Sequence, residues 1–303
     1  MSSTHTAQLK KGLWLGLLGI TIFAMTLPMT RLAVGTPEAP LMSGLFIAVG
    51  RAVVAGLLSA LFLWWGKAPL PPRDTWGPLV LVALGVVFGF PIFTSLAMRH
   101  VEAVHASVMV GVLPLATAVV GALLNRQRPS AGFWVCALAG TALVVAFAVL
   151  RSGHSGLSLQ TADVLLLLAM ACAAVGYGHG GRLSQRMRAE HVICWALVMA
   201  LPINLPLAVW QFPSLALPAS AWGAFAYVSV FSMWLGFFAW YRGLALGGTV
   251  RVSQVQLLQP FLTLLFAVPV LGEQLDPVTV LCALSAMAVV FVGRRMPVAR
   301  GAR

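Results

Sequence analysis

Charged residues are scarce in this chain, and acidic residues are the scarcest of them. Charged side chains make up 9% of the 303 residues, and only 7 are Asp or Glu. A soluble domain usually carries about 25% charged residues. Hydrophobic residues reach 60% and are spread along the whole length, which excludes a soluble body with a single membrane anchor. The composition therefore predicts an all-α polytopic membrane protein surrounded by membrane lipid.

Motifs of several other protein classes are also absent. The four cysteines form no C-x-x-C pair and lie in apolar runs, which indicates neither a disulfide framework nor a metal site: Cys136, Cys172, Cys194 and Cys282. No H-E-x-x-H motif and no P-loop occurs, so a zinc protease and an ATP-driven pump find no support. We expect no metal, no cofactor and no catalytic residue. The net charge of +12 does not indicate nucleic-acid binding, because Lys and Arg fall singly or in pairs between apolar runs.

Apolar runs long enough to cross a membrane, for which about 20 residues are needed, follow one another with short polar links. Ten such spans are predicted, at 12–34, 41–65, 76–98, 103–124, 130–150, 161–183, 192–210, 219–241, 251–271 and 276–293. An even number of spans places both termini on the same side of the membrane.

The distribution of Lys and Arg between the links indicates which side that is. With cytoplasmic termini, only Arg31, Arg99 and Arg151 fall on the far side, and Arg51 falls inside a span. The cytoplasmic side receives Lys10, Lys11, Lys67, Arg73, Arg126, Arg128, Arg182, Arg186, Arg188, Arg242, Arg251, Arg294, Arg295, Arg300 and Arg303. Because cytoplasmic loops are enriched in Lys and Arg, we predict a multi-pass protein of the cell inner membrane with both termini in the cytoplasm.

The sequence also repeats itself when it is shifted by 146 positions. The first matched positions are Val104 with Val250, Ser107 with Ser253, Pro114 with Pro260, and Thr117 with Thr263. Further along the chain, Cys136 to Leu138 matches Cys282 to Leu284. The repeat predicts two halves, 12–150 and 161–295, with five spans each. Since five is odd, the second half is inverted, an architecture typical of secondary transporters.

Several motifs resemble one known family. The stretches "RAVVAGL" from Arg51, "LLQPFLTLLFAVPVLGEQL", "GVLPLATAVVGALLNRQRPS" and "FFAWYRGLALGGTVRVSQVQ" resemble the EamA type of the drug/metabolite transporter superfamily. Within it, the chain looks most like bacterial inner-membrane exporters of amino acids and related metabolites, of the aromatic amino acid type. Two positions depart from the family pattern: Phe23-Ala24 replaces Trp-Gly, and Gln127 replaces a Glu.

One face of the ninth span is polar. Because each helical residue turns about 100°, a single arc holds Ser253, Gln256, Gln259, Pro260 and Thr263. An amide is costly against lipid, so this face should meet protein or water. Pro260 should also leave the carbonyl of Gln256 without its helical donor. We interpret the face as a lining of the substrate path that could bind an ammonium group; the alternative is that the glutamines join helices.

The equivalent face of the fourth span carries Pro114 and Thr117 but no amide. A pocket between the two spans would be polar on one side and apolar on the other, which suits an amino acid with an apolar or aromatic side chain. Aromatic walls could come from Trp234, Tyr177 and His179, although these residues could instead anchor helix ends. The same two roles are open to Trp240 and Tyr241, for which we favour interfacial anchoring.

Two intramembrane basic residues are open to more than one role. Arg51 could bind a carboxylate or hydrogen-bond free carbonyls, and we favour the packing role because the resemblance covers transporters of varied cargo. His179 could carry a proton. No acidic residue is placed at mid-membrane, so we expect cargo to move without obligatory proton coupling.

The sequence thus favours a carrier that exports amino acids by alternating access. The alternatives are a carrier of another class, such as drugs or sugars, and a polytopic membrane enzyme. An enzyme would need paired acid and base groups at one depth. Monomer and homodimer are both compatible with the sequence.

Overall fold

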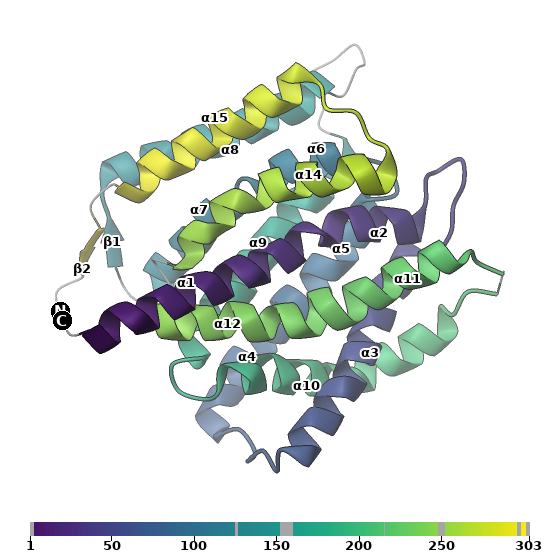
Figure 1. Ribbon diagram of the computed structural model, residues 1–303, viewed down its shortest axis with the longest axis horizontal. Helices are drawn as coiled ribbons and strands as arrows, with labels where there is room; N and C mark the ends of the chain where they lie inside the picture. The colour runs from purple at the N-terminus through teal and green to yellow at the C-terminus, as the bar shows by residue number, and fades with distance from the viewer. Residues whose placement is uncertain are drawn as a thin grey trace.

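Helices make up nearly all of the computed structural model, which describes residues 3–124, 127–151, 160–214, 216–247, 252–295 and 298–300 (Figure 1). The first half comprises α1 (Ser3–Ala24), α2 (Thr26–Val34), α3 (Gly44–Trp65), η1 (Arg73–Thr75), α4 (Trp76–Val82), η2 (Ala83–Gly89), α5 (Phe90–Ala97), α6 (Ala103–Val110), α7 (Leu113–Leu124), β1 (Gln127–Pro129) and α8 (Ala131–Arg151). The second comprises α9 (Thr161–Leu183), α10 (Ala189–Trp210), α11 (Ala219–Tyr227), η3 (Val228–Leu235), α12 (Gly236–Gly247), η4 (Ser253–Leu258), α14 (Gln259–Leu271), α15 (Pro277–Arg295) and β2 (Val298–Arg300).

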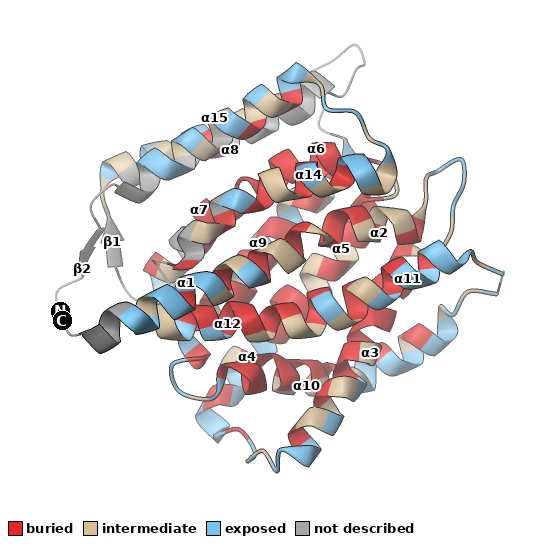
Figure 2. Cartoon of the chain, in the orientation of Figure 1, coloured by how far each residue is buried: buried red, intermediate tan, exposed pale blue. Residues whose placement is uncertain are grey.

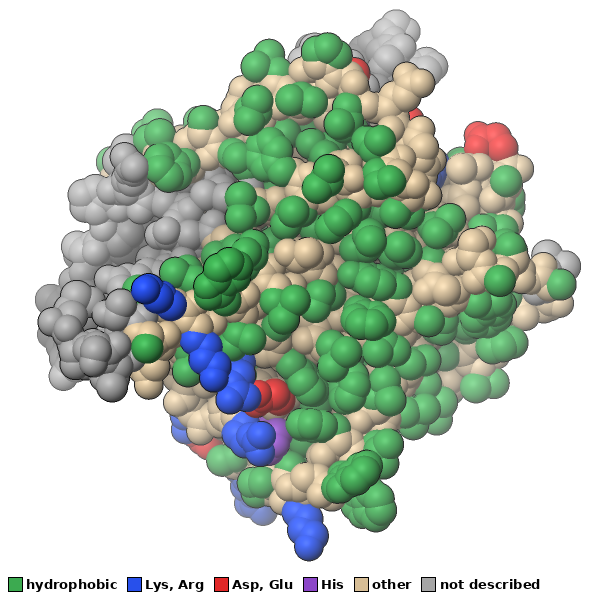
Figure 3. Space-filling model, viewed as in Figure 1, with side chains coloured by type: hydrophobic (Ala, Val, Ile, Leu, Met, Phe, Trp, Pro, Cys, Tyr) green, Lys and Arg blue, Asp and Glu red, His purple; other side chains and the backbone are tan. Residues whose placement is uncertain are grey.

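The helices are those of a multi-pass membrane protein. Within the described residues, seven helical segments are long and apolar enough to cross a membrane: Ala7–Val34, Gly44–Trp65, Arg73–Ala97, Ala103–Leu124, Thr161–Leu183, Ala189–Trp210 and Ala219–Gly247. Gln259–Leu271 and Pro277–Val289 are shorter apolar helices. Large apolar side chains remain exposed on the outside, among them Trp64, Val209 and Leu281, as Figure 3 shows over one face. Such a surface is stable only against lipid or another apolar partner.

The middle of the molecule is formed by helices from both halves. Figure 2 shows buried residues concentrated on α5, α9 and α12, whereas α15 at the edge is largely exposed or intermediate. α1 packs along α12, and α5 packs along α9. α3 packs on α10, and α8 packs on α15. Thus each of these contacts joins an element of one half to an element of the other.

Element boundaries recur with the spacing found in the sequence. α5 and α12 begin at Phe90 and Gly236, 146 positions apart. The same separation relates the starts of α7 and α14, and of α8 and α15. Both π-helical turns, η2 and η3, end 146 positions apart, at Gly89 and Leu235. Since a π-helical turn is rare, its recurrence is stronger support for an internal repeat than the helix starts alone.

The predicted all-α class is confirmed, and the described residues add one short strand pairing to it. β1 and β2 form an antiparallel two-stranded ladder that joins the segment after α7 to the segment after α15. The register pairs Gln127 with Arg300 and Pro129 with Val298. A proline cannot donate to a ladder, which is consistent with the strand ending at Pro129. The pairing links residues far apart in sequence, so no local pattern predicts it.

α1 and α12 approach each other to backbone contact. A Cβ built on Gly243 would lie 2.8 Å from the backbone nitrogen of Gly16 and 2.9 Å from the carbonyl oxygen of Gly12. Only glycine fits such an approach, and small residues commonly permit it in membrane helices. The contact lies near the end of the molecule where Lys10 and Lys11 are exposed.

Charge is divided between the two ends of the molecule. We call the end that carries Lys10, Lys11, Lys67, Arg186 and Arg242 the basic end; part of it is seen at the lower left of Figure 3. There, Arg242 donates to Glu190 at 2.6 Å, and Arg186 pairs with Asp74. The opposite, acidic end carries Glu38, Glu102, Glu273 and Asp276. The asymmetry is that expected of a protein oriented in a membrane.

Candidate functional site

The ninth predicted span changes its helical winding near its middle. A 3₁₀ helix, η4, runs to Leu258, and α14 begins at Gln259 with Pro260 in its first turn. Contrary to the sequence prediction, the Gln256 carbonyl is not left without a donor, because the tighter 3₁₀ turn lets it accept from the Gln259 N–H. The fourth span is interrupted at the corresponding place, between Val110 and Leu113. Two broken helices thus contribute to the same region, since α7 packs against η4.

The amides of Gln256 and Gln259 are buried at this break, with exposed fractions of 1% and 5%. Gln256 Oε1, Gln256 Nε2 and Gln259 Oε1 meet no hydrogen-bond partner in the part of the chain that the structure describes. Glutamines that join helices would be bonded across the interface. An unsatisfied buried amide costs about 1–3 kcal/mol. These groups are therefore better explained as sites for a ligand or for water than as joints between helices.

The other predicted members of the polar face have different roles. The Thr263 hydroxyl donates to the Ala24 carbonyl at 2.9 Å, where the chain breaks between α1 and α2. Thr263 therefore joins two helices and places the glutamine face against the end of α1. The side chain of Ser253 lies outside the described part of the structure.

The opposing wall from the fourth span is apolar, as its sequence indicates. Pro114 is buried, and the Thr117 hydroxyl donates to the Leu113 carbonyl of its own helix at 2.8 Å. Neither side chain offers a free polar group towards a cargo. The region is consequently polar on the side of η4 and apolar on the side of α7.

Aromatic rings from both halves meet beside this region. The central aromatic cluster consists of Phe23, Tyr177, Phe237, Trp240 and Tyr241. Tyr177 lies 6.2 Å from Phe23, 6.0 Å from Phe237 and 5.7 Å from Trp240, measured between ring centroids. Phe23 directly precedes Ala24, whose carbonyl receives the Thr263 hydrogen bond. The cluster therefore adjoins the broken helices.

The prediction that Trp240 and Tyr241 anchor the chain at the membrane interface is wrong. Both are 0% exposed, and the Tyr241 hydroxyl donates to the Gly176 carbonyl at 3.2 Å. Trp240 Nε1 is buried without a partner among the described residues. The sequence analysis missed this, because their burial depends on α1 and α9 packing against α12.

Two further predicted residues lie away from the cluster. Trp234 packs against Phe62 at 6.2 Å and Phe238 at 5.1 Å. His179 is only partly buried, and no hydrogen bond or ion pair involves it within the described ranges. The structure thus brings Tyr177 to the central region but leaves Trp234 and His179 outside its ring contacts.

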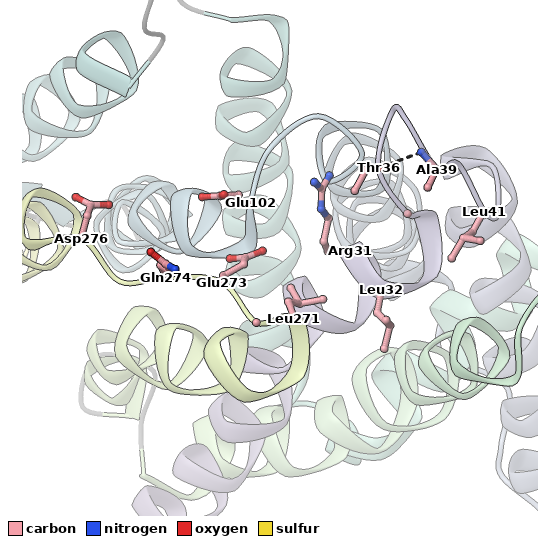
Figure 4. Close-up of a pocket in the computed structure, with 12 residues that line it drawn as sticks. Arg31, Leu32, Thr36, Ala39, Leu41, Glu102, Leu271, Glu273, Gln274 and Asp276 are labelled. Carbon is pink, nitrogen blue, oxygen red and sulfur yellow. Dashed lines mark hydrogen bonds between the residues drawn. The ribbon is translucent and has the colours of Figure 1, made fainter.

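A second feature, not predicted from the sequence, is a pocket of about 750 Å³ at the acidic end (Figure 4). Arg31 of α2, Glu102 before α6 and Glu273 after α14 line it. The Glu273 carboxylate accepts the N–H groups of Ala103 and Val104 at 2.8 and 2.7 Å. It thereby caps α6 across the two halves. Burial raises the pKa of the Glu273 carboxyl despite these two bonds.

A buried acid–base pair also escaped the sequence analysis. His105 Nε2 and Asp163 Oδ1 lie 2.7 Å apart, with exposed fractions of 7% and 1%. Asp163 also accepts the N–H of Gln160 at the start of α9. About 14 residues of α9 separate Asp163 from Tyr177, or roughly 21 Å along a helix. The pair is therefore distant from the central aromatic cluster.

Comparisons with known proteins agree on one family. The model of the EamA-like transporter family matches residues 10–149 and again residues 160–293. Uncharacterized transporter YdeK of Bacillus subtilis (strain 168) is 41% identical over 282 residues, covering 92% of this chain and 96% of that protein. Uncharacterized transporter sll0355 of Synechocystis sp. is 25% identical over 249 residues, with coverages of 76% and 75%. A solved crystal structure shares the fold, with a TM-score of 0.62, 18% identity and coverages of 94% and 98%.

Proposed function

This chain belongs to the EamA-like transporter family of the drug/metabolite transporter superfamily, and from that premise we propose that it exports amino acids with apolar or aromatic side chains, and related small metabolites, across the bacterial inner membrane. The observation that carries the proposal is the burial of the Gln256 and Gln259 amides, three of whose atoms meet no partner among the described residues. They lie where two broken helices pack together, next to the central aromatic cluster. Discontinuous helices near the midplane form the substrate sites of many secondary transporters.

The proposed architecture is ten spans in two inverted repeats, 12–150 and 161–295. It is supported by the element starts that recur 146 positions apart and by the two matches of one family model. With five spans in each half, the second half enters the membrane from the opposite side. Such halves can rock around a central site and expose it to each side in turn. Alternating access is therefore the transport mechanism that we propose.

The polarity of the central region favours an amino acid over the other cargo classes. The region offers few polar groups, namely the two glutamine amides and the Trp240 N–H. A sugar needs many hydrogen-bond partners around its ring. All seven acidic residues lie at or beyond the ends of the spans, so the region holds no carboxylate for a cationic drug. An ammonium group can be received by the amide oxygens of Gln256 and Gln259. An apolar or aromatic side chain can pack on the central aromatic cluster.

The alternative class, a polytopic membrane enzyme, requires an acid and a base at one depth. The pair His105 and Asp163 meets that description. It lies toward the acidic end of α9, away from the broken helices, and Asp163 already caps that helix. A carrier therefore explains the central unpartnered amides better than an enzyme does.

The proposal is tested by counterflow into proteoliposomes that contain the purified protein. Labelled L-phenylalanine and L-leucine should enter vesicles preloaded with the same amino acid much faster than they enter vesicles that contain no amino acid. Labelled glucose and tetraphenylphosphonium should not. Counterflow of glucose alone, or of tetraphenylphosphonium alone, would contradict the amino-acid proposal and favour the other carrier classes.

We predict that both termini and the basic end face the cytoplasm. Cysteine introduced at the exposed Arg188 should react with an impermeant thiol reagent only from the cytoplasmic side, because basic loops are retained there. Cysteine introduced at the exposed Glu38 should react only from outside. The measurement is labelling in intact cells against inverted vesicles, in a background without native cysteines. Labelling of the Arg188 site in intact cells would contradict this orientation.

We also predict that proton coupling is not obligatory. No acidic side chain lies beside Gln256 or Gln259 in the described structure, so the central region offers no carboxylate to carry a proton. Downhill efflux of L-phenylalanine from liposomes should persist without a pH difference. Accumulation driven by a pH difference alone, and abolished by His105→Gln or His179→Ala, would show that one of these histidines couples the two fluxes.

A further inference from the structure

Arg51 is an uncompensated charge at the core of the molecule. It lies in the middle of α3, is 1% exposed and is among the largest fully buried side chains. Guanidinium stays protonated in proteins and presents five N–H donors. Nε and Nη1 are buried without any hydrogen-bond partner in the described structure. Burial of a charge in that state is costly, and in a membrane protein it marks a functional position.

No acidic residue compensates this charge. The described acids have other partners: Asp163 pairs with His105, Glu190 with Arg242, Asp74 with Arg186, and Glu273 caps α6. Glu38, Glu102 and Asp276 lie in loops at the acidic end. No salt bridge joins Arg51 to a carboxylate within the described ranges. No described side chain therefore supplies a negative charge to Arg51.

Packing alone does not require an arginine at this place. The residue 146 positions later is Leu197 of α10, which is 0% exposed. α3 and α10 start at corresponding positions to within one residue and pack on each other. The corresponding site of the repeat therefore accepts a neutral aliphatic side chain. This comparison argues against the packing role that the sequence analysis favoured.

The surroundings of Arg51 connect it with the central aromatic cluster. Its Cζ lies 6.0 Å from the centre of the Phe90 ring. Phe90 belongs to α5, which packs on α3 and on α9, the helix that carries Tyr177. Tyr177 in turn contacts Phe23 and Trp240. A ring face attracts a guanidinium but satisfies few of its N–H donors. The donors therefore remain available for a planar anion, and arginine matches a carboxylate with two parallel hydrogen bonds.

We propose that Arg51 binds the carboxylate of the cargo and selects molecules that carry one. The inference rests on the proposed function and deepens it. The carboxylate pairs with the guanidinium of Arg51, beside the Phe90 ring. A cargo in which the carboxylate is replaced by a neutral amide loses the charge-assisted bond, which amounts to roughly a tenfold or greater loss of affinity.

The test compares three probes on the purified full chain: L-phenylalanine, L-phenylalaninamide and 3-phenylpropanoate. Dissociation constants come from the ligand dependence of the melting temperature. The wild type should bind L-phenylalanine at least about tenfold more tightly than its amide. Arg51→Gln should abolish that preference, and Arg51→Lys should keep part of it. Arg242→Gln, which removes one positive charge at the basic end, should keep all of it.

The outcomes separate the two proposals. Equal binding of the acid and the amide by the wild type would overturn the role of Arg51 and leave amino-acid export standing. If Arg51→Gln keeps the full preference for L-phenylalanine over its amide, the role of Arg51 is likewise overturned and amino-acid export is unaffected. Binding of 3-phenylpropanoate without binding of phenylalanine would support Arg51 and remove the amino-acid proposal. Binding of none of the three probes would overturn both. If Arg51→Gln does not fold, the wild type and Arg51→Lys still decide.

Discussion

Alanine at Gln256 or at Gln259 should lower L-phenylalanine transport at least about tenfold while the protein stays folded in the membrane. A hydrogen bond from an amide to a charged group contributes roughly 1.5–3 kcal/mol, and about 1.4 kcal/mol corresponds to a tenfold change in affinity. Three of these amide atoms have no hydrogen-bond partner within the described ranges. Removing them breaks no hydrogen bond, so the melting temperature should be unchanged or higher.

This combination of a lost function and a retained fold distinguishes the two interpretations of the glutamines. Gln185→Ala is the matched control, because Gln185 is exposed at the basic end. It should leave both transport and stability unchanged. Variants of Gln256 and Gln259 that melt at lower temperature and keep wild-type affinity for phenylalanine would show that the glutamines join helices.

Gly243→Ala should destabilise the protein by about 1–3 kcal/mol, the usual cost of overpacking a core. The added Cβ would lie within 3 Å of backbone atoms of Gly12 and Gly16, and a backbone cannot move aside as a flexible side chain can. α1 and α12 must therefore separate at the basic end. The measurement is thermal unfolding of the purified protein in detergent.

Gly223 supplies a matched control within the same membrane-length segment, Ala219–Gly247. Nothing lies within 4 Å of a Cβ built on Gly223 in α11. Gly223→Ala should be neutral or slightly stabilising, because alanine favours the helix over glycine. Equal melting temperatures for Gly243→Ala and the wild type would contradict the backbone contact between α1 and α12.

Most of the helical pattern follows from local properties of the sequence. Each predicted span overlaps a helical segment of the structure, because runs of about 20 apolar residues are a strong signal. The family resemblance is confirmed by the match of the family model to both halves. The buried, polar face of Gln256 and Gln259 was also predictable, since it depends on helical periodicity within one span.

The remaining features depend on contacts between distant segments. His105 and Asp163 are 58 positions apart in sequence, so neither residue signals the pair. Tyr241 and Trp240 are buried because α9 and α1 cover α12, which no local pattern shows. The sequence predicts a regular helix at Gln256, whereas the structure has a 3₁₀ turn there, which supplies a donor to the Gln256 carbonyl. In each case tertiary packing decided the outcome.

The most direct test of a cargo path at the broken helices is the protection of a cysteine at Gln259. In a variant without the native cysteines, Gln259→Cys should react with methyl methanethiosulfonate as the transporter cycles. We predict that L-phenylalanine slows this reaction in proportion to its occupancy of the protein. A reaction rate that is unchanged at phenylalanine concentrations that saturate transport would contradict a cargo path at the broken helices.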